Sequence, residues 1–360
     1  MRILFLTPYP LGKAPSQRFR FEQYLPELDA QGWQYQLVPF LDEATWSILY
    51  KPGHVGAKVL GILGGLWRRL LLVLTAVGKY DVVFVHREAA PVGPPVIEWL
   101  IARVLRKRIV YDFDDAIWLQ DPAWERAFAS RLKYPRKVSL ICRWADRVSC
   151  GNAYLRDYAA QFSPQAVINP TTLDTENLHN IVRSQATAPG GTVVIGWTGT
   201  HSTLRHLDLL WPVLERLEQE GHRFEFRVIS NFPPDYEGLK SLTFRPWRKD
   251  TEIADLAGFH FGLMPLVDDA WARGKCAFKA LQYMALGMPA LVSPVGMNTE
   301  VVQDGHNGYV CATDEEWYEA IRRLLTDEAL RTRLGTAARR TIVERYSVLS
   351  NTRNFLNLFK

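Results

Sequence analysis

The sequence predicts an α/β protein made of two doubly wound parallel sheets, and two observations lead to this fold class. Short apolar runs alternate with helical periodicity along both halves of the chain, as in strands joined by helical crossovers. The chain has 360 residues, more than one ordinary hydrophobic core supports. We therefore expect two domains, at residues 1–170 and 171–345.

The first half contains six predicted strands separated by helices. The run DVVFVH at residues 81–86 is apolar almost throughout, as in parallel strands that are buried on both faces. Gly32 ends the first long helical pattern. The expected strands are 2–7, 35–39, 81–86, 108–112, 147–150 and 167–168. The expected helices are 18–31, 55–77, 95–105, 136–145 and 153–161.

The second half repeats this order after a segment at residues 170–191 that is rich in Thr, Asn, Ala and Gly and is the predicted linker. The expected strands are 192–197, 224–229, 242–245, 261–264, 290–293 and 309–310. The expected helices are 204–220, 275–286, 314–325 and 328–345. Ligands of such sheets bind at the carboxyl ends of the strands, so we expect a site in a cleft between the domains.

The net charge of +5 is unevenly distributed. Residues 1–150 hold 21 Lys/Arg against 14 Asp/Glu, whereas the remainder holds 22 against 24. A basic first half favours an anionic partner, such as a membrane surface or a phosphorylated substrate. The sequence contains no RNA- or DNA-binding signature, so we expect no nucleic-acid partner.

The four cysteines indicate neither a metal site nor a redox pair. Cys142, Cys150, Cys276 and Cys311 match neither a zinc pattern nor a CxxC motif. The N-terminal apolar run is too short for a signal peptide and is followed by prolines. These features predict a cytoplasmic protein with reduced, mostly buried cysteines.

The segment 55–77 is rich in Leu, Gly, Val and Ile, but Trp67, Arg68 and Arg69 interrupt it. Two arginines in the middle of the segment argue against a transmembrane helix. A tryptophan with basic residues on an apolar helix is typical of a helix that lies in a membrane interface. The alternative is a helix packed on its own domain. The first interpretation predicts peripheral contact with the inner face of the plasma membrane.

The segment GKCAFKALQYMALGMP at residues 274–289 predicts an anion site. Lys275 and Lys279 lie four residues apart, which places them on one face at the start of the predicted helix. Cations are unfavourable there because the helix N-terminus is already positive. A bound diphosphate would remove this conflict, since exposed amides at a helix start bind phosphate. Two solvated lysines are the alternative.

Other residues of the second half are candidates for the same ligand. Gly199 and Thr200 follow the strand at 192–197 and would let backbone amides approach a phosphate, with Arg205 as a further cation. Asp268 and Asp269 would bind sugar hydroxyls, or they are solvated loop acids.

Charged residues also follow the strands of the first half. Asp112, Asp114 and Asp115 repel one another, which is costly unless a cation, a metal or a proton-transfer role offsets it. A carboxylate of this group would act as a base or accept a sugar hydroxyl. The alternative is a capped turn, and no third metal ligand lies nearby in the sequence.

Arg18 and Arg20 belong to the loop after the first strand, where they would clamp a phosphate or carboxylate. His86 ends another strand and would serve as a base. Solvated arginines and a structural histidine are the alternatives.

Several segments together resemble one family, the retaining GT-B-fold glycosyltransferases of family 4, also called glycosyl transferases group 1. These segments are RILFLTPYP, SQRFRFEQYLP, VVFVHRE, VYDFDDAIW, GWTGT, GLMPL, GKCAFKALQYMALGMPALVSPVG and EVVQDGHNGYV. The resemblance implies two Rossmann-like domains facing a cleft, with a nucleotide-diphospho-sugar donor bound mainly by the second domain. It also implies that no metal or other cofactor is needed. The helix at 346–360 is expected to cross back to the first domain.

The resemblance implies sugar transfer with retention to an acceptor hydroxyl, in glycan biosynthesis. Lys275, Lys279 and Arg205 would stabilise the leaving diphosphate, and Asp114 or Asp115 would orient the acceptor or stabilise the sugar cation. Arg18, Arg20, His86 and Asp112 would lie on the acceptor side. The acceptor would be a glycan, a lipid-linked molecule or a small molecule.

The sequence departs from the family at two positions where glutamates are common. Gly274 has no side chain for the donor sugar, and Gln282 can bond a ribose without charge. Either Asp268 or Asp269 would replace the missing sugar contact, or the backbone would make it. Two other functions stay open. One is a nucleotide-sugar epimerase that uses His86 with an aspartate of 112–115. The other is a nucleotide-sugar-binding protein with weakened catalysis.

Overall fold

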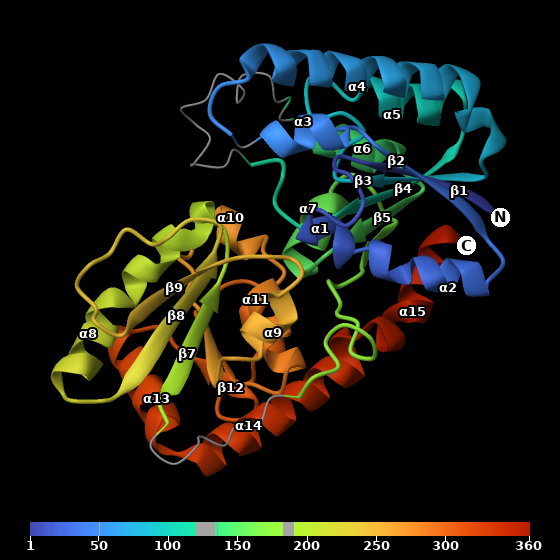
Figure 1. The fold of residues 1–360 in the computed structure, drawn as a ribbon. Helices are drawn as coiled ribbons and strands as arrows, with labels where there is room; N and C mark the ends of the chain where they lie inside the picture. The colour runs from blue at the N-terminus through green and yellow to red at the C-terminus, as the bar shows by residue number, and fades with distance from the viewer. Residues whose placement is uncertain (50, 120–133, 135, 183–190) are drawn as a thin grey trace. The chain divides into compact units, whose positions relative to one another are not determined.

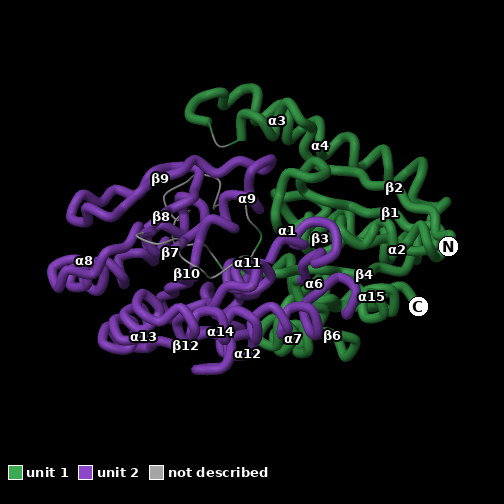
Figure 2. The backbone as a smooth tube through the Cα atoms, turned by 60° about the horizontal axis from the view of Figure 1, so that its bottom comes forward, with its two compact units in different colours: residues 1–171, 351–360 green, residues 172–350 purple. Residues whose placement is uncertain are grey.

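The computed structural model describes residues 1–49, 51–119, 134, 136–182 and 191–360. The chain forms two compact units (Figures 1 and 2). Unit 1 comprises residues 1–171 and 351–360, and unit 2 comprises residues 172–350. The predicted linker, 170–191, includes residues 183–190, which lie outside the described residues.

Unit 1 contains a parallel sheet of six strands in the order β2-β1-β3-β4-β5-β6. Its central strands are buried because Val, Ile, Leu and Phe occupy both faces of them. The strands are β1 (Arg2–Thr7), β2 (Gln34–Pro39), β3 (Val82–His86), β4 (Arg108–Phe113), β5 (Arg147–Cys150) and β6 (Ala166–Ile168).

Helices cover this sheet, with α4, α5 and α6 together on one side of it (Figure 1). The α-helices are α1 (Pro15–Arg18), α2 (Leu25–Ala30), α3 (Glu43–Ile48), α4 (Val55–Thr75), α5 (Val96–Trp99), α6 (Lys137–Trp144), α7 (Ala153–Ala160) and α15 (Val348–Leu356). Shorter or wider turns are η1 (Glu22–Tyr24), η2 (Val77–Lys79), η3 (Leu100–Val104, a π-helix) and η8 (Asn357–Phe359).

The C-terminal residues complete the core of unit 1. Phe355 stacks on Tyr24, with ring centroids 4.3 Å apart, and its ring also lies 6.4 Å from that of Phe84. Phe359 packs against Phe5 and Phe84 at 6.2 and 5.9 Å. All of these aromatic side chains are buried. The first and last segments of the chain therefore share one hydrophobic core.

Unit 2 contains a second parallel sheet, in the order β12-β11-β10-β7-β8-β9. Its strands are β7 (Val193–Thr198), β8 (Phe224–Ser230), β9 (Leu242–Pro246), β10 (Phe261–Met264), β11 (Ala290–Val292) and β12 (Gly308–Val310). Its helices are η6 (His201–Leu209), α8 (Trp211–Gln219), α9 (Glu252–Leu256), α10 (Ala270–Arg273), α11 (Phe278–Ala285), α12 (Asn298–Val301), α13 (Asp314–Thr326), α14 (Glu328–Thr341) and η7 (Ile342–Tyr346). Two parallel sheets with helical crossovers confirm the predicted fold class.

Three predicted helices are wrong in extent, and local chemistry explains each case. The helix expected at 18–31 is broken into α1, η1 and α2, where Pro26 occupies the first turn of α2. The helix expected at 204–220 is divided as well: Pro212 lies in the first turn of α8, and the residues before it form the separate 3₁₀ turns of η6. Proline fits a first helical turn but cannot donate the hydrogen bond that an interior position requires. The helix expected at 275–286 begins only at Phe278, because Ala277 is left-handed, with φ of 51°.

Two further sequence predictions concern the membrane and the cysteines. Among the described helices, none is both long enough and apolar enough to cross a membrane. Cys142, Cys150, Cys276 and Cys311 are buried and form no disulfide.

The aromatic core of unit 1 leads to a prediction about the C-terminal segment. Phe355→Ala should lower the free energy of unfolding by about 3–5 kcal/mol, because it leaves a cavity beside Tyr24 and Phe84. Leu349→Ala is the matched control, since this side chain is 70% exposed, and should change stability by less than about 0.5 kcal/mol. Urea denaturation of the full chain measures both. Equal effects would show that α15 contributes little to the core.

Candidate functional site

Basic side chains of unit 2 gather around His206. Lys279 lies on α11, Lys275 just before it, and Arg205 and His206 on η6. Burial, followed by the charges of Lys279, Arg205 and Lys275, lowers the pKa of His206 to about 4, while Asp269 opposes this shift. The structure thus brings together the three cations that the sequence suggested for a diphosphate. We call Arg205, Lys275 and Lys279 the cation cluster.

The expected placement of the two lysines on one helix face is wrong. Lys275 precedes α11, and the left-handed Ala277 separates it from Lys279 in the first turn. Each ammonium lies beside an aromatic ring instead: Lys279 Nζ is 5.5 Å from the ring centroid of Trp197, and Lys275 Nζ is 6.0 Å from that of Trp271. Cation–π contacts of this kind hold a charge in place without neutralising it.

The surroundings of Lys279 disfavour its charged form. Burial, followed by the neighbouring charge of Lys275, lowers the pKa of Lys279 to about 7. Within the described residues, no carboxylate pairs with Lys279 or Arg205. A partly desolvated ammonium such as that of Lys279, next to other cations and without an acidic partner in the described ranges, is costly, and a bound polyanion would offset that cost.

The turn after β7 is held differently from what we expected. Its backbone amides already donate to protein acceptors: Thr198 to Tyr283 Oη, Gly199 to the Ile229 carbonyl and Thr200 to Thr203 Oγ1. The side chain of Thr200 also caps η6. Phosphate binding by Gly199 and Thr200 stays a prediction, and it requires these amides to exchange partners.

The acids before α11 have partners within their own loop. Asp268 receives two hydrogen bonds from Arg273, at 2.7 and 3.0 Å, which lower its pKa. Asp269 caps α10 by accepting from the Ala272 amide at 2.6 Å. These are structural roles, and sugar binding by Asp268 and Asp269 stays a prediction.

Gly274 and Gln282, the two positions where the family commonly has glutamates, precede and follow Lys275 in the sequence. Gly274 ends α10. Gln282 is only 2% exposed, and its side-chain amide donates to Glu252 Oε1 at 3.3 Å. Sequence reasoning missed Glu252 because a glutamate at a helix start is commonly solvated. The structure therefore places a buried carboxylate next to Gln282.

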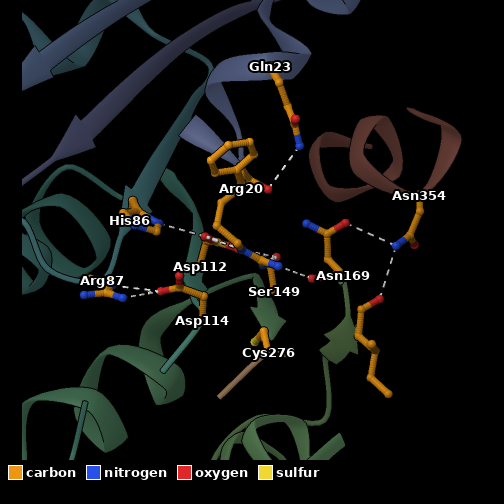
Figure 3. A network of polar contacts seen from close by, with 12 residues as sticks. Arg20, Gln23, His86, Arg87, Asp112, Asp114, Ser149, Asn169, Cys276 and Asn354 are labelled. Atoms are coloured by element: carbon orange, nitrogen blue, oxygen red, sulfur yellow. Dashed lines mark hydrogen bonds and ion pairs between the residues drawn. The ribbon is translucent and has the colours of Figure 1, made fainter. Parts of the chain in front are cut away.

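In unit 1, three predicted acceptor-side residues bind one another in a buried network (Figure 3). Asp112, at the end of β4, pairs with the guanidinium of Arg20. It also accepts from Ser149 Oγ at 2.6 Å and contacts His86 Nδ1 at 2.8 Å. Arg20 donates in addition to the Asn169 carbonyl, and Asn169 Oδ1 accepts from Asn354 of α15.

This network fixes the charge state of its carboxylate. Burial would raise the pKa of Asp112, but the charge of Arg20 and the contact with His86 hold it well below its usual range. Arg20, His86 and Asp112 are each at most 1% exposed. His86 Nε2 is buried and has no partner among the described residues. Ligand contact by these residues stays a prediction, whereas their contact with one another is part of the fold.

Asp114 has a cationic partner that sequence reasoning did not assign. Arg87 donates to Asp114 Oδ1 at 2.8 Å. Burial would lower the pKa of Arg87, but Asp114 and Asp115 raise it above its usual value. Arg87 has a left-handed φ of 58°, a strained conformation for this residue. Arg87 thereby offsets the repulsion that we expected among the three aspartates.

Arg18 and a nearby pocket complete the candidate residues of unit 1. Arg18 is 9% exposed, and its guanidinium lies 4.8 Å from the ring centroid of Phe19. A pocket of about 540 Å³ is lined by residues around the ends of β1 and β2, namely Thr7, Pro10, Leu11, Gln17, Leu37, Pro39, Asp42 and Glu43. Over the described ranges, no group of three His, Cys, Asp or Glu is arranged to hold a metal ion.

The buried pair of unit 1 leads to a stability prediction. Arg20→Met leaves Asp112 buried without its main cation and should lower the free energy of unfolding by about 3–5 kcal/mol. Arg156→Met is the control, because Arg156 pairs with Asp157 at the surface, and should cost at most about 1 kcal/mol. Arg20→Met combined with Asp112→Leu should recover part of the loss in urea denaturation. No recovery would mean that packing of Arg20, rather than its charge, stabilises unit 1.

One segment of unit 2 matches a known family. Residues 275–341 match the family model of the glycosyl transferases group 1, and this segment includes both lysines of the cation cluster. No curated protein matches the chain.

Solved structures share the fold at low sequence identity. TarM of S. aureus is 14% identical, with a TM-score of 0.61, and the match covers 81% of this chain and 57% of that one. Sucrose-phosphate synthase from Thermosynechococcus elongatus is 13% identical, with a TM-score of 0.67 and coverage of 99% and 98%. HepE of Anabaena, in complex with UDP-glucose, is 17% identical, with a TM-score of 0.67 and coverage of 99% and 98%.

The chain thus spans 57% of the length of TarM but almost the whole of the other two proteins. At these identities the likeness concerns the fold, and it agrees with the two parallel six-stranded sheets. The chain therefore has the GT-B fold of glycosyltransferases, and its segment 275–341 carries the glycosyl transferases group 1 pattern.

Proposed function

We propose that this protein is a glycosyltransferase that moves a sugar from a nucleotide-diphospho-sugar to an acceptor hydroxyl. The cation cluster of unit 2 is the observation that carries the proposal. It presents positive charge without an ion-pair partner for Lys279 and Arg205 among the described residues, and its lysines lie in the segment that matches the family model. A diphosphate carries the opposite charge and accepts charge-assisted hydrogen bonds from such cations.

In this proposal the cation cluster acts on the leaving group. As the bond from the sugar to the diphosphate breaks, negative charge grows on the phosphate oxygens. Lys275, Lys279 and Arg205 stabilise that charge in a site where part of the water is excluded. Three protein cations can take the place of a divalent metal, so we propose a metal-independent reaction.

The acceptor side is assigned to unit 1. Asp114, oriented by Arg87, and Asp115 would orient the acceptor hydroxyl or stabilise positive charge on the sugar. The pocket near the ends of β1 and β2 is large enough for part of a glycan, lipid-linked or small-molecule acceptor. Retention of the anomeric configuration is proposed on the family resemblance, with the leaving phosphate accepting the proton of the acceptor.

The donor sugar is proposed to be a hexose, contacted near α10 and α11. The Gln282 side chain donates to Glu252, which places a carboxylate next to the position where the family commonly has a glutamate. The structure does not favour the epimerase alternative. That reaction needs a base that faces a sugar ring, and the side chain of His86 is fully buried against Asp112.

Binding of UDP and UDP-glucose tests the proposal at the cation cluster. Lys279→Ala should weaken the affinity for both by about 10- to 100-fold, which corresponds to the loss of one charge-assisted contact. Lys249→Ala, an exposed lysine of the same unit, is the control and should leave the affinity unchanged. Isothermal titration calorimetry measures both variants. If the original protein binds neither UDP nor UDP-glucose, the titration is repeated with other nucleoside diphosphates. If none of these ligands binds, the proposed donor site is rejected.

Turnover then distinguishes an enzyme from a binding protein. If an added acceptor hydroxyl increases the release of UDP from UDP-glucose, the protein transfers sugar. Binding of UDP-glucose without release of UDP supports a nucleotide-sugar-binding protein with weakened catalysis. The same assay in excess EDTA tests metal independence, since a metal-dependent enzyme would lose its activity.

The lowered pKa of Lys279 predicts a pH dependence of nucleotide binding. Its pKa of about 7 means that the ammonium loses its proton as the pH rises through 7. UDP affinity should therefore fall between pH 6.5 and 8.5, and binding should take up a proton. His206 stays neutral over this range, since its pKa is about 4. Lys279→Arg stays charged and should bind UDP with a nearly constant affinity. An equal pH dependence in both proteins would contradict the assignment.

A further inference from the structure

The outer face of α4 is an apolar surface on unit 1. Its exposed side chains recur at steps of three or four residues, which places them along one side of the helix. They are Val59, Leu60, Leu63, Trp67, Leu71 and Leu74. The helix α5, which packs beside α4, also has the exposed side chains Val96 and Trp99 (Figure 1). We call this surface the apolar face.

The opposite side of α4 fixes which residues point outward. Arg69, expected from the sequence to lie at a membrane interface, is instead 1% exposed and donates to the carbonyls of Ala89 and Thr7 at 2.8 Å each. A Cβ on Gly65 would lie 2.8 Å from the ring of Phe40, so the helix packs closely on the domain. These contacts prevent α4 from turning its apolar face inward.

Basic residues flank the segments of the apolar face along the chain, since they lie before, within and shortly after α4 and within and after η3. Residues 51–107 hold nine Lys/Arg and three Asp/Glu. Each acid is already occupied: Asp81 by Arg2, Glu88 by Lys137, and Glu98 by the Ala89 amide in the interior. Within the described part of the chain, seven of these nine cations form no ion pair with a carboxylate, namely Lys51, Lys58, Arg69, Lys79, Arg103, Arg106 and Lys107.

We propose that the apolar face docks on an anionic lipid bilayer, with α4 lying in the interface. Leucines and Trp67 enter the boundary between headgroups and acyl chains, and the flanking cations contact anionic headgroups. A second copy of this chain is a less suitable partner for the apolar face. A two-fold interface would place the same cations against one another without acids between them. This docking is independent of the nucleotide site, because the residues involved belong to unit 1.

Flotation with vesicles tests the proposal on the full chain. The protein should float with vesicles of equimolar phosphatidylcholine and phosphatidylglycerol, and much less with phosphatidylcholine alone. The variant Leu63→Gln, Trp67→Gln, Leu71→Gln should reduce the bound fraction at least about tenfold, because glutamine keeps the helix but removes the apolar contact. The matched control is Leu209→Gln, Val343→Gln, Leu349→Gln, which changes exposed apolar residues of unit 2 and should float like the original protein.

A charge variant distinguishes the electrostatic contribution to vesicle binding from the apolar contribution. Lys79→Glu with Arg103→Glu should weaken flotation on anionic vesicles severalfold, and higher salt should weaken the original protein similarly. UDP binding measured on each variant shows whether the chain stays folded. The proposal is overturned if the original protein does not float, or if the control variant loses flotation equally. It is also overturned if light scattering shows a dimer that the glutamine variant abolishes while flotation is absent.

Discussion

The ion pair between Arg20 and Asp112 organises the end of the sheet in unit 1. One guanidinium reaches the carboxylate after β4 and the carbonyl of Asn169 after β6, while the same carboxylate binds His86 of β3 and Ser149 of β5. Four neighbouring strands therefore end in one shared set of polar contacts. Asn354 extends the set to α15, so the C-terminal helix depends on it as well.

Two charged sites, one in each unit, differ in how their charges are compensated. At the site of unit 1, buried or half-buried charges pair with one another, as Arg20 with Asp112, Arg87 with Asp114 and Lys137 with Glu88. In unit 2, Lys279 and Arg205 lie near a third cation, and the ammonium group of Lys279 lies beside the ring of Trp197, with no acid paired to it among the described residues. A paired charge stabilises the fold, whereas a charge without a counterion is available to a ligand. This contrast is why the donor is assigned to unit 2.

The sequence predicts the sheets well because the strands are buried on both faces and read as apolar runs, as in residues 81–86. It predicts helix limits less well, since Pro26, Pro212 and Ala277 act through single backbone positions. Lys275, Lys279 and Arg205 were identified by residue type, although the shared helix face was wrong. The contacts Arg87–Asp114 and Gln282–Glu252 join residues 27 and 30 positions apart, so only the folded chain reveals them. The burial of Arg69 also depends on carbonyls from distant loops.

The return of the chain to unit 1 has a consequence for folding during synthesis. Residues 172–350 form unit 2 from one continuous segment, so this unit is complete as soon as that segment has left the ribosome. Unit 1 starts earlier but lacks Phe355 and Phe359 until residues 351–360 follow, and its aromatic core stays open on the side that α15 covers. The unit that is made first is therefore the one that is finished last, and during that interval Tyr24 and Phe84 are exposed to chaperones and to other chains.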